Sequence, residues 1–232
     1  MVILDQPTRL ATNSAYGYDI KLDYGRISMC FMNAARKNIK INRAKPNRVR
    51  IIAGDWRSRL LKFPDVSGLR PTTDKGRETL FNWLGQYMYD YSCLDLFSGS
   101  GALGFEALSR GAAYVVMVEK QQRVFDFLAE NAKVLGAGSR LTLIHQDALD
   151  FLHTSKQRFD LVFLDPPFGY GLLDRVLPDV VKLIKPGGLV YVESEEEIPP
   201  PKGLRFRRHA KSGVSHHLLF EASVSPFDEN NG

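Results

Sequence analysis

Short apolar runs alternate with segments of helical periodicity through most of the chain after residue 90. The runs of four to six residues predict buried strands, and the longer segments between them predict helices. Strands that alternate with crossover helices form a parallel sheet that is covered on both faces. The pattern therefore predicts an α/β fold with a doubly wound, mostly parallel sheet. The predicted strands are 93–96, 114–118, 141–144, 161–164 and 189–192, and the predicted helices are 102–110, 121–135, 148–153 and 172–184, the last stopped by Pro186-Gly187-Gly188.

Two hairpins and one further helix flank this alternating part. Residues 50–53 and 56–64 predict two short strands about a turn at Gly54, and 204–209 with 214–221 predict an antiparallel pair. Apolar residues at helical spacing over 80–88 predict a helix that starts near the N-cap candidates Thr72, Thr73 and Asp74. We accordingly expect a flexible basic extension at 1–47, a hairpin and loop at 48–71, the main domain at 72–222 and a flexible tail at 223–232.

Composition narrows the class of protein. With 232 residues, 44% of them hydrophobic and 25% charged, the chain is long enough to bury one core. No apolar run approaches the ~18 residues that a membrane helix needs, and the N-terminus lacks a signal-peptide pattern. Cys30 and Cys93 stand far apart without metal-ligand spacing, which argues against a disulfide or zinc framework. We expect a monomeric cytoplasmic protein that holds no metal.

The positive charge is unevenly spread. Lysine and arginine outnumber aspartate and glutamate by 31 to 26, and residues 24–54 carry eight basic residues and no acid. This arm is either a solvated tail or a segment that grips the phosphates of a nucleic acid, and the sequence leaves both open. The candidate phosphate contacts in the arm and the first hairpin are Arg43, Lys45, Arg48, Arg57 and Arg59.

A glycine-rich loop follows the first strand of the main domain. Gly99, Gly101 and Gly104 satisfy G-x-G-x-x-G between a predicted strand and a predicted helix, which allows a ligand to approach the backbone. Glu119 ends the next strand 20 residues after Gly99, where a carboxylate can bind two ribose hydroxyls. The alternative is that the glycines only form a tight turn and that Glu119 caps a helix.

The charge at the end of the first strand separates two nucleoside cofactors. Asp95 would repel the pyrophosphate of NAD, whereas it would attract the sulfonium and ammonium groups of S-adenosylmethionine. The sequence therefore favours S-adenosylmethionine. Asp147, followed by Ala148, is placed to accept a hydrogen bond from the adenine amino group or to cap the helix at 148–153, and both roles are compatible.

A second set of candidates follows the strand at 161–164. Ligands of open parallel sheets bind beyond the carboxyl ends of the strands, so Asp165 and Phe168 should lie on the same edge as the glycine loop. An exocyclic amino group is a poor nucleophile until acceptors hold its N–H bonds, and the Asp165 carboxylate with the Pro166 carbonyl offers two acceptors. The Phe168 ring can stack on the base. The alternative is a strand terminator with a core phenylalanine.

These motifs resemble known enzymes. Asp165-Pro166-Pro167-Phe168 together with Asp95-x-Phe97-x-Gly99-x-Gly101 is similar to the amino-group methyltransferases of nucleic acids. The segments 50–54, 69–74, 77–84 and 191–195 resemble the bacterial 16S ribosomal RNA (guanine(966)-N(2))-methyltransferase family. The resemblance covers about residues 48–221, and residues 1–45 depart from it.

The resemblance implies a Rossmann-like class I methyltransferase fold with a seven-stranded sheet. It implies methyl transfer from S-adenosylmethionine to the N2 of one guanine in 16S ribosomal RNA, within the small subunit or an assembly intermediate. It also implies that Phe97 borders the cofactor and that Arg70 and Arg77 border the cofactor and the RNA. The competing functions are a DNA amino methyltransferase, an NAD-dependent dehydrogenase and a non-catalytic RNA-binding module.

Overall fold

The computed structural model of the protein describes residues 46–66, 74–169 and 171–223. The chain divides into a unit of residues 1–43 and a unit of residues 44–232, and all described residues belong to the second unit.

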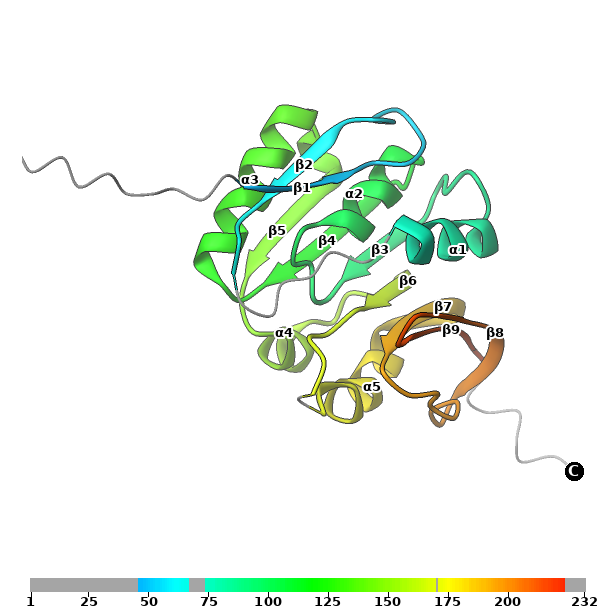
Figure 1. Cartoon of the computed structure of the whole chain (residues 1–232). Coiled ribbons are helices and arrows are strands. Elements are labelled where there is room, and N and C mark those ends of the chain that lie inside the picture. Colours follow the sequence, from blue (N-terminus) through cyan, green and yellow to red (C-terminus); the bar gives the residue numbers. More distant parts are fainter. Residues whose placement is uncertain (1–45, 67–73, 170, 224–232) are drawn as a thin grey trace, which may run out of the picture. The chain divides into compact units, whose positions relative to one another are not determined.

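A seven-stranded sheet forms the centre of this unit (Figure 1). The strand order is β5-β4-β3-β6-β7-β9-β8, and the pairs from β5 to β7 are parallel, whereas β9 runs antiparallel to both β7 and β8. The predicted doubly wound sheet with its antiparallel end is confirmed. The strands are β3 (Ser92–Asp95), β4 (Tyr114–Glu119), β5 (Leu141–His145), β6 (Phe159–Leu164), β7 (Ile184–Ser194), β8 (Leu204–Ser212) and β9 (Ser215–Ala222).

Helices pack on both faces of the sheet and bury two apolar clusters. One cluster joins α1, α2 and α3 to one face, and the other joins α4 and α5 to the opposite face. The helix α3 ends as predicted, because Gly136 adopts the left-handed conformation with φ of 68°. The helices are α1 (Asp74–Leu84), α2 (Ala102–Ser109), α3 (Gln122–Leu135), α4 (Ala148–Thr154) and α5 (Leu172–Leu183), with a short 3₁₀ turn η1 (Gly138–Arg140) before β5.

The expected stop after α5 differs from the structure. The helix ends at Leu183, and β7 begins at the next residue, so Pro186-Gly187-Gly188 lie inside a long strand. The register between β6 and β7 shifts at this point, which lets the strand accommodate a proline. A Cβ on Gly188 would lie 2.9 Å from the Lys185 carbonyl oxygen, so the close approach of the backbone requires glycine here.

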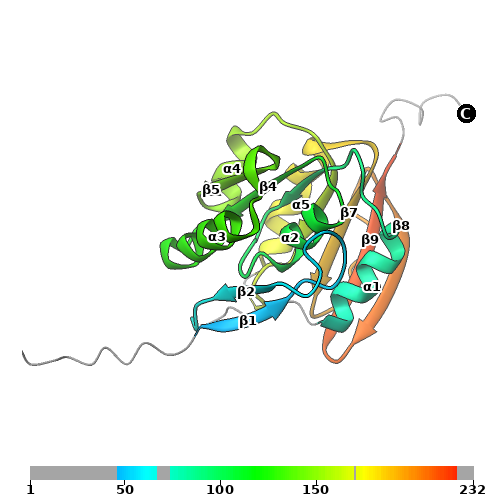
Figure 2. The same ribbon diagram turned by 90° about the horizontal axis from the view of Figure 1, so that it is seen from above.

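The predicted first hairpin is present, but its first strand lies three residues earlier than expected and its second strand is shorter. It consists of β1 (Asn47–Arg50) and β2 (Leu60–Phe63), and it lies alongside α2 and α3 (Figures 1 and 2). The strand was expected to continue to Ala53. Instead, the backbone N–H groups of Ile52 and Ala53 donate to the Glu106 carboxylate of α2, at 2.7 and 3.0 Å. The connection between the strands is therefore a loop fixed to α2.

The strands of the sheet end on two opposite sides of the molecule, here called the carboxyl edge and the opposite edge. The carboxyl edge is formed by the carboxyl ends of β3 to β7, and the opposite edge by their amino ends. The turn between β8 and β9 lies at the carboxyl edge, because Ser194 at the end of β7 pairs with His216. The C-terminal ends of α2 and α3 lie at the opposite edge, since each helix returns the chain to the start of a strand.

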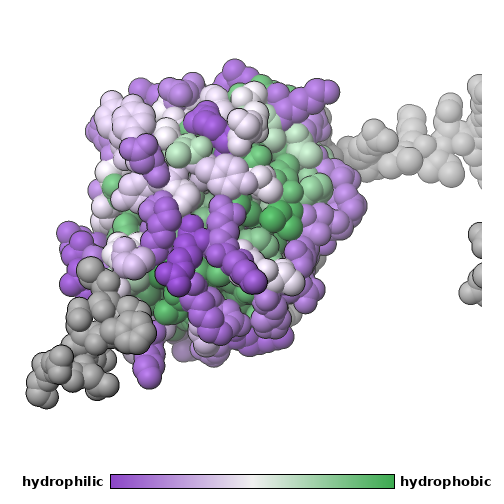
Figure 3. Space-filling view, turned by 180° about the vertical axis from the view of Figure 1, so that it is seen from behind, coloured by the Kyte–Doolittle hydropathy of each residue, from purple (hydrophilic) through white to green (hydrophobic). Residues whose placement is uncertain are grey.

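The surface is mixed in character. From behind, hydrophilic side chains cover much of the face, and hydrophobic ones gather toward one side (Figure 3). Among the described residues, no helix combines the length and the apolar content that crossing a membrane requires.

Candidate active site

The glycine loop connects β3 to α2 at the carboxyl edge. Gly99 and Gly101 have φ of 48° and 77°, a region that favours glycine. Gly104 meets a different requirement, since a Cβ there would lie 2.3 Å from the Met117 side chain of β4. The helix α2 therefore packs closely on the sheet, and its first backbone N–H groups face the carboxyl edge.

Asp95 ends β3 beneath this loop. Its side chain is 2% exposed, and its Oδ2 accepts a hydrogen bond from the Gly104 N–H at 3.1 Å. Burial raises the pKa of Asp95 to about 7, the Gly104 hydrogen bond opposes this rise, and the charge of Glu119 adds to it. Within the described residues, no lysine or arginine forms an ion pair with Asp95.

Glu119 occupies the end of β4, next to the loop. Its Oε2 accepts from the Gly99 N–H at 3.1 Å and its Oε1 from the Gln121 N–H at 2.7 Å. A carboxylate offers about four lone-pair sites, so acceptor capacity remains for two ribose hydroxyls. The expected position of Glu119 beside the glycine loop is confirmed, and its ribose contact remains a prediction.

Asp147 follows β5 and caps α4. Its Oδ1 accepts from the Leu149 N–H at 2.9 Å, which confirms the expected N-cap role. Its Oδ2 lies 3.9 Å from the Lys120 Nζ, and both side chains are partly exposed. The capping bond leaves further lone pairs on the carboxylate, so the contact with adenine beside the buried Ala148 stays a prediction.

The acceptor motif leaves the end of β6. Asp95 of β3 pairs with Phe163, so Asp165 stands two residues beyond that pair, at the same edge as the glycine loop. Asp165 is half-buried, Pro166 is buried and Phe168 is 37% exposed. Phe97 is half-buried and packs against the core on the α4 and α5 side. The structure thus gathers the predicted cofactor and acceptor residues at one edge.

Sequence reasoning missed a buried polar cluster beside this motif. Tyr191 and Glu193 of β7 and His217 of β9 are all buried, and the Tyr191 hydroxyl is hydrogen-bonded to the His217 Nδ1 at 2.7 Å. The His217 Nε2 continues the chain to the Ser212 hydroxyl at 2.7 Å. Alternation places Tyr191 and Glu193 on one face of β7, but their partner could be found only by knowing that β9 lies beside β7.

Burial dominates the electrostatics of this cluster. It raises the pKa of Tyr191, together with the charges of Glu193 and Asp165, and it raises the pKa of Glu193. Burial also lowers the pKa of His217, with the nearby His209 and His216 acting in the same direction. The charge of Asp165 thus acts on a buried network that the sequence did not reveal.

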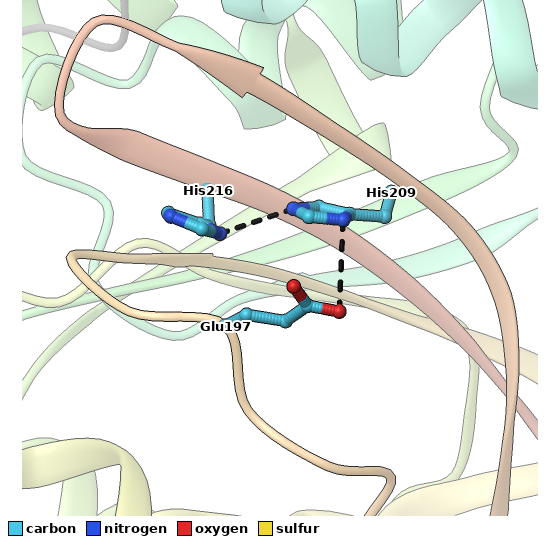
Figure 4. A group of neighbouring side chains, drawn as sticks. All are labelled: Glu197, His209 and His216. Carbon is cyan, nitrogen blue, oxygen red and sulfur yellow. Dashed lines mark hydrogen bonds and ion pairs between the residues drawn. The ribbon is translucent and has the colours of Figure 1, made fainter.

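A second group of polar side chains lies near the turn between β8 and β9. Glu197, His209 and His216 come from the loop after β7, from β8 and from β9 (Figure 4). The His209 ring faces Glu197 through Nδ1 at 3.7 Å and His216 through Nε2 at 3.0 Å. One ligand atom of each of the three residues lies within 4.8 Å of the others, and His209 contacts Glu197 and His216 through its two different ring nitrogens.

The predicted RNA contacts fall in different places. Arg48, Arg57 and Arg59 are exposed on the hairpin and its loop. Arg59 donates to the Val134 carbonyl at 3.3 Å, in the last turn of α3, which places it at the opposite edge, away from Asp165. Arg43, Lys45 and Arg70 lie outside the described residues.

The structure contradicts the expected contact between Arg77 and RNA. Its side chain is 0% exposed, and its guanidinium pairs with Asp74 and, at 3.6 Å, with Glu106. A buried guanidinium cannot reach a phosphate. The error arose because the sequence shows an arginine in an amphipathic helix but not the carboxylate of α2 that faces it.

The chain is similar in sequence and structure to known methyltransferases. The fold, the glycine loop and the carboxylates at one edge define an S-adenosylmethionine-dependent methyltransferase. The chain belongs to the family described as "Conserved hypothetical protein 95", whose family model matches residues 49–221. This confirms the resemblance found over residues 48–221.

Named relatives lie within the same family. The chain is 41% identical over 192 residues to "Ribosomal RNA small subunit methyltransferase D" of Haemophilus influenzae, which covers 80% of this chain and 99% of the relative. The protein of the same name from Escherichia coli K12 is 44% identical over 191 residues, covering 78% and 94%. The solved structure of yhhF from Escherichia coli has a TM-score of 0.71 and 40% identity, covering 77% of this chain and 100% of that one.

Proposed function

We propose that this protein transfers a methyl group from S-adenosylmethionine to the exocyclic N2 of a guanine in 16S ribosomal RNA. The observation that carries the proposal is the position of Asp165-Pro166-Pro167-Phe168 at the same edge as Asp95 and the glycine loop. The relatives at 41% and 44% identity are named ribosomal RNA small subunit methyltransferases, which supports RNA of the small subunit as the substrate.

The residues present fit the cofactor. When bound, S-adenosylmethionine supplies an electrophilic methyl group on a sulfonium sulfur. Asp95 is a buried carboxylate without an ion pair to a described lysine or arginine, and it complements the positive charges of that molecule. The glycine loop admits the ligand to the backbone, and Glu119, Asp147 and Ala148 lie at the next two strand ends, where they would hold its adenosine.

The acceptor motif would prepare the guanine. The Asp165 carboxylate and the Pro166 carbonyl would accept hydrogen bonds from the two N–H groups of the amino group. These hydrogen bonds direct the nitrogen lone pair toward the methyl group. As the new N–C bond forms, the bond between the sulfonium sulfur and the methyl group would break and S-adenosylhomocysteine would leave. Positive charge grows on the nitrogen until it loses a proton, and the Asp165 carboxylate would stabilise that charge. Phe168, partly exposed at the rim, provides a face on which the base can stack.

The test uses small-subunit particles from a strain that lacks this protein. We expect purified protein and S-adenosylmethionine to restore one N2-methylguanine in 16S RNA, measured by mass spectrometry of nuclease fragments. The variant Asp165→Asn should restore far less of this mark. Its matched control is Asp150→Asn, which alters an exposed aspartate in α4 away from the acceptor motif. If the methyl group is found on any other atom or RNA, the proposed function is wrong.

The runner-up is a DNA amino methyltransferase, since the Asp-Pro-Pro-Phe end suits any exocyclic amino group. The same assay with duplex and single-stranded DNA separates the two functions. Transfer to DNA at the rate found for RNA would favour the runner-up.

A further inference from the structure

Two exposed tyrosines stand at the opposite edge, and the proposed chemistry does not use them. Tyr87 and Tyr89 follow α1, and they are 66% and 65% exposed. Their rings are stacked, with centroids 5.3 Å apart and planes within 8° of parallel. Single exposed aromatic residues need no explanation, but two rings side by side form a contiguous apolar patch, which is a candidate interaction site. We call this pair the tyrosine platform.

Backbone contacts with the segment 110–112 fix the position of the tyrosine platform. Met88, between the two tyrosines, is buried, and its N–H donates to the Arg110 carbonyl at 3.0 Å. Tyr89 forms an isolated antiparallel bridge with Ala112. A Cβ on Gly111 would lie 2.7 Å from the Tyr89 ring, so the glycine lets the ring lie against the chain. The stack is therefore a positioned surface.

The loop of the first hairpin borders the same end of α2. The Asp55 N–H donates to the Ser109 carbonyl at 2.7 Å, and the Trp56 N–H donates to the Ser109 hydroxyl at 2.9 Å. Arg57 follows directly and is exposed. Asp55 and Asp90 are exposed nearby, so the surface is not a continuous basic field, and stacking must supply most of its affinity.

The platform lies far from the acceptor motif. The segments 88–91 and 109–113 precede β3 and β4, whereas Asp165 follows β6 at the carboxyl edge. The six residues of β4 separate the two edges by about 20 Å, at roughly 3.3 Å per residue. A nucleotide bound at the platform is therefore not a neighbour of the target base.

We propose that Tyr87 and Tyr89, with Arg57, form a second contact surface for the substrate RNA, on which bases remote from the target stack. This inference rests on the proposed function. Two parallel aromatic rings, each about two-thirds exposed, suit unpaired bases, and the positive charge of the exposed Arg57 suits an RNA phosphate. It follows that the enzyme favours RNA large enough to reach both edges of the sheet.

The test compares the affinity of the full chain for two RNAs by fluorescence anisotropy. One is full-length 16S RNA, and the other is a stem-loop that carries the target guanine on a stem of fewer than about six base pairs, which is shorter along its axis than the ~20 Å between the two edges. We expect Tyr87→Ala/Tyr89→Ala to weaken binding of the long RNA about tenfold or more and to leave the short RNA unchanged. Tyr87→Phe/Tyr89→Phe keeps the rings and should bind as the wild type does.

Two further variants sharpen the result. Arg57→Ala should reduce the salt dependence of long-RNA binding by about 0.7–0.9 log units per log unit of salt. Phe206→Ala removes an exposed aromatic ring of β8 and should leave the affinity for both RNAs unchanged. Equal affinity of the double alanine variant and the wild type for the long RNA overturns the proposal, as does an equal loss on both RNAs. Failure of the wild type to methylate RNA would instead overturn the proposed function, because the binding comparison does not depend on methyl transfer.

Discussion

Asp95 and Glu106 are two buried carboxylates on consecutive elements, and their surroundings differ completely. Glu106 is 0% exposed and accepts from two backbone N–H groups of the hairpin loop and from the Arg110 Nε at 2.9 Å, and Arg77 lies 3.6 Å away. Asp95 has one backbone N–H and no ion pair with the described lysines and arginines. The charge of Glu106 is compensated by two arginines, whereas Asp95 has no such partner among the described residues.

The difference is consistent with a structural role for Glu106 and with the cofactor contact proposed for Asp95. Removing one partner of a buried ion pair leaves the other charge unpaired, so Glu106 is tied to the stability of the fold. A carboxylate whose pKa has risen to about 7 lowers the stability of the folded state when it ionises, and proteins keep such groups where they bind or react. This comparison can be tested from both sides.

The largest expected effect is on folding. Glu106→Gln leaves the buried Arg110 without its carboxylate and Arg77 with only Asp74, and we expect the free energy of unfolding to fall by about 3–5 kcal/mol. Urea denaturation measures it. Glu130→Gln is the control, because Glu130 pairs with Lys62 at 3.7 Å between exposed side chains, where about 0–1 kcal/mol is at stake. A change in Glu106→Gln no greater than in this control would contradict the structural role.

The next effect is on chemistry at the carboxyl edge. Asp165→Asn removes the charge that stabilises the methylated nitrogen, and kcat should fall about a hundredfold or more, a barrier increase of about 2.7 kcal/mol or above. Single-turnover methylation of unmodified small-subunit particles measures it, and the affinity for S-adenosylmethionine serves as the internal control. Wild-type rates in Asp165→Asn would remove Asp165 from the mechanism.

A smaller effect is expected on cofactor affinity. Glu119→Ala deletes a charged acceptor for ribose hydroxyls, so the Kd for S-adenosylmethionine should rise about ten- to a hundredfold, or about 1.5–3 kcal/mol. Isothermal titration calorimetry provides the measurement. Because Glu119 also accepts from the Gly99 and Gln121 N–H groups, Glu119→Gln is the matched variant and should lose less. Unchanged binding in Glu119→Ala would refute the ribose contact.

Taken per pH unit, the smallest effect is the pH dependence of stability that Asp95 causes. Between about pH 4 and 7 the folded state keeps a proton on Asp95 that the unfolded state has lost, so rising pH destabilises the folded state by up to about 1.4 kcal/mol per pH unit. Above pH 7 this contribution no longer changes. Asp95→Asn should lack the slope, as measured by urea titrations across this range. Parallel curves for the two proteins would show that Asp95 is not protonated in the folded state.

Much of the fold could be predicted because its signals are local. The apolar runs located β4 and β6, and the periodicity with Gly136 located α3 and its end. Asp95, Glu119 and Asp165 came together because each ends a parallel strand, and such ends share one edge. These inferences need only the order of the elements along the chain.

The rest depended on contacts between distant segments. The sequence marks Glu106 as a lone charge in an apolar helix, but only the structure shows the two arginines and the hairpin loop around it. The placement of Arg77, and the pairing of Tyr191 with His217, likewise require tertiary packing. The helix predicted over 80–88 was too long, because α1 ends at Leu84, and the helical spacing hid that Tyr87 is an exposed residue beyond the helix.

The insertion of β9 between β7 and β8 has a consequence for synthesis. During translation, at about 5–20 residues per second, β8 emerges before β9, and its partner in the finished sheet does not yet exist. Residues up to Ala222 must leave the ribosome before the last two strands can join the sheet. A nascent chain of this protein therefore carries an unpaired, arginine-rich strand until β9 is made, and those charges protect the strand from joining a neighbouring chain.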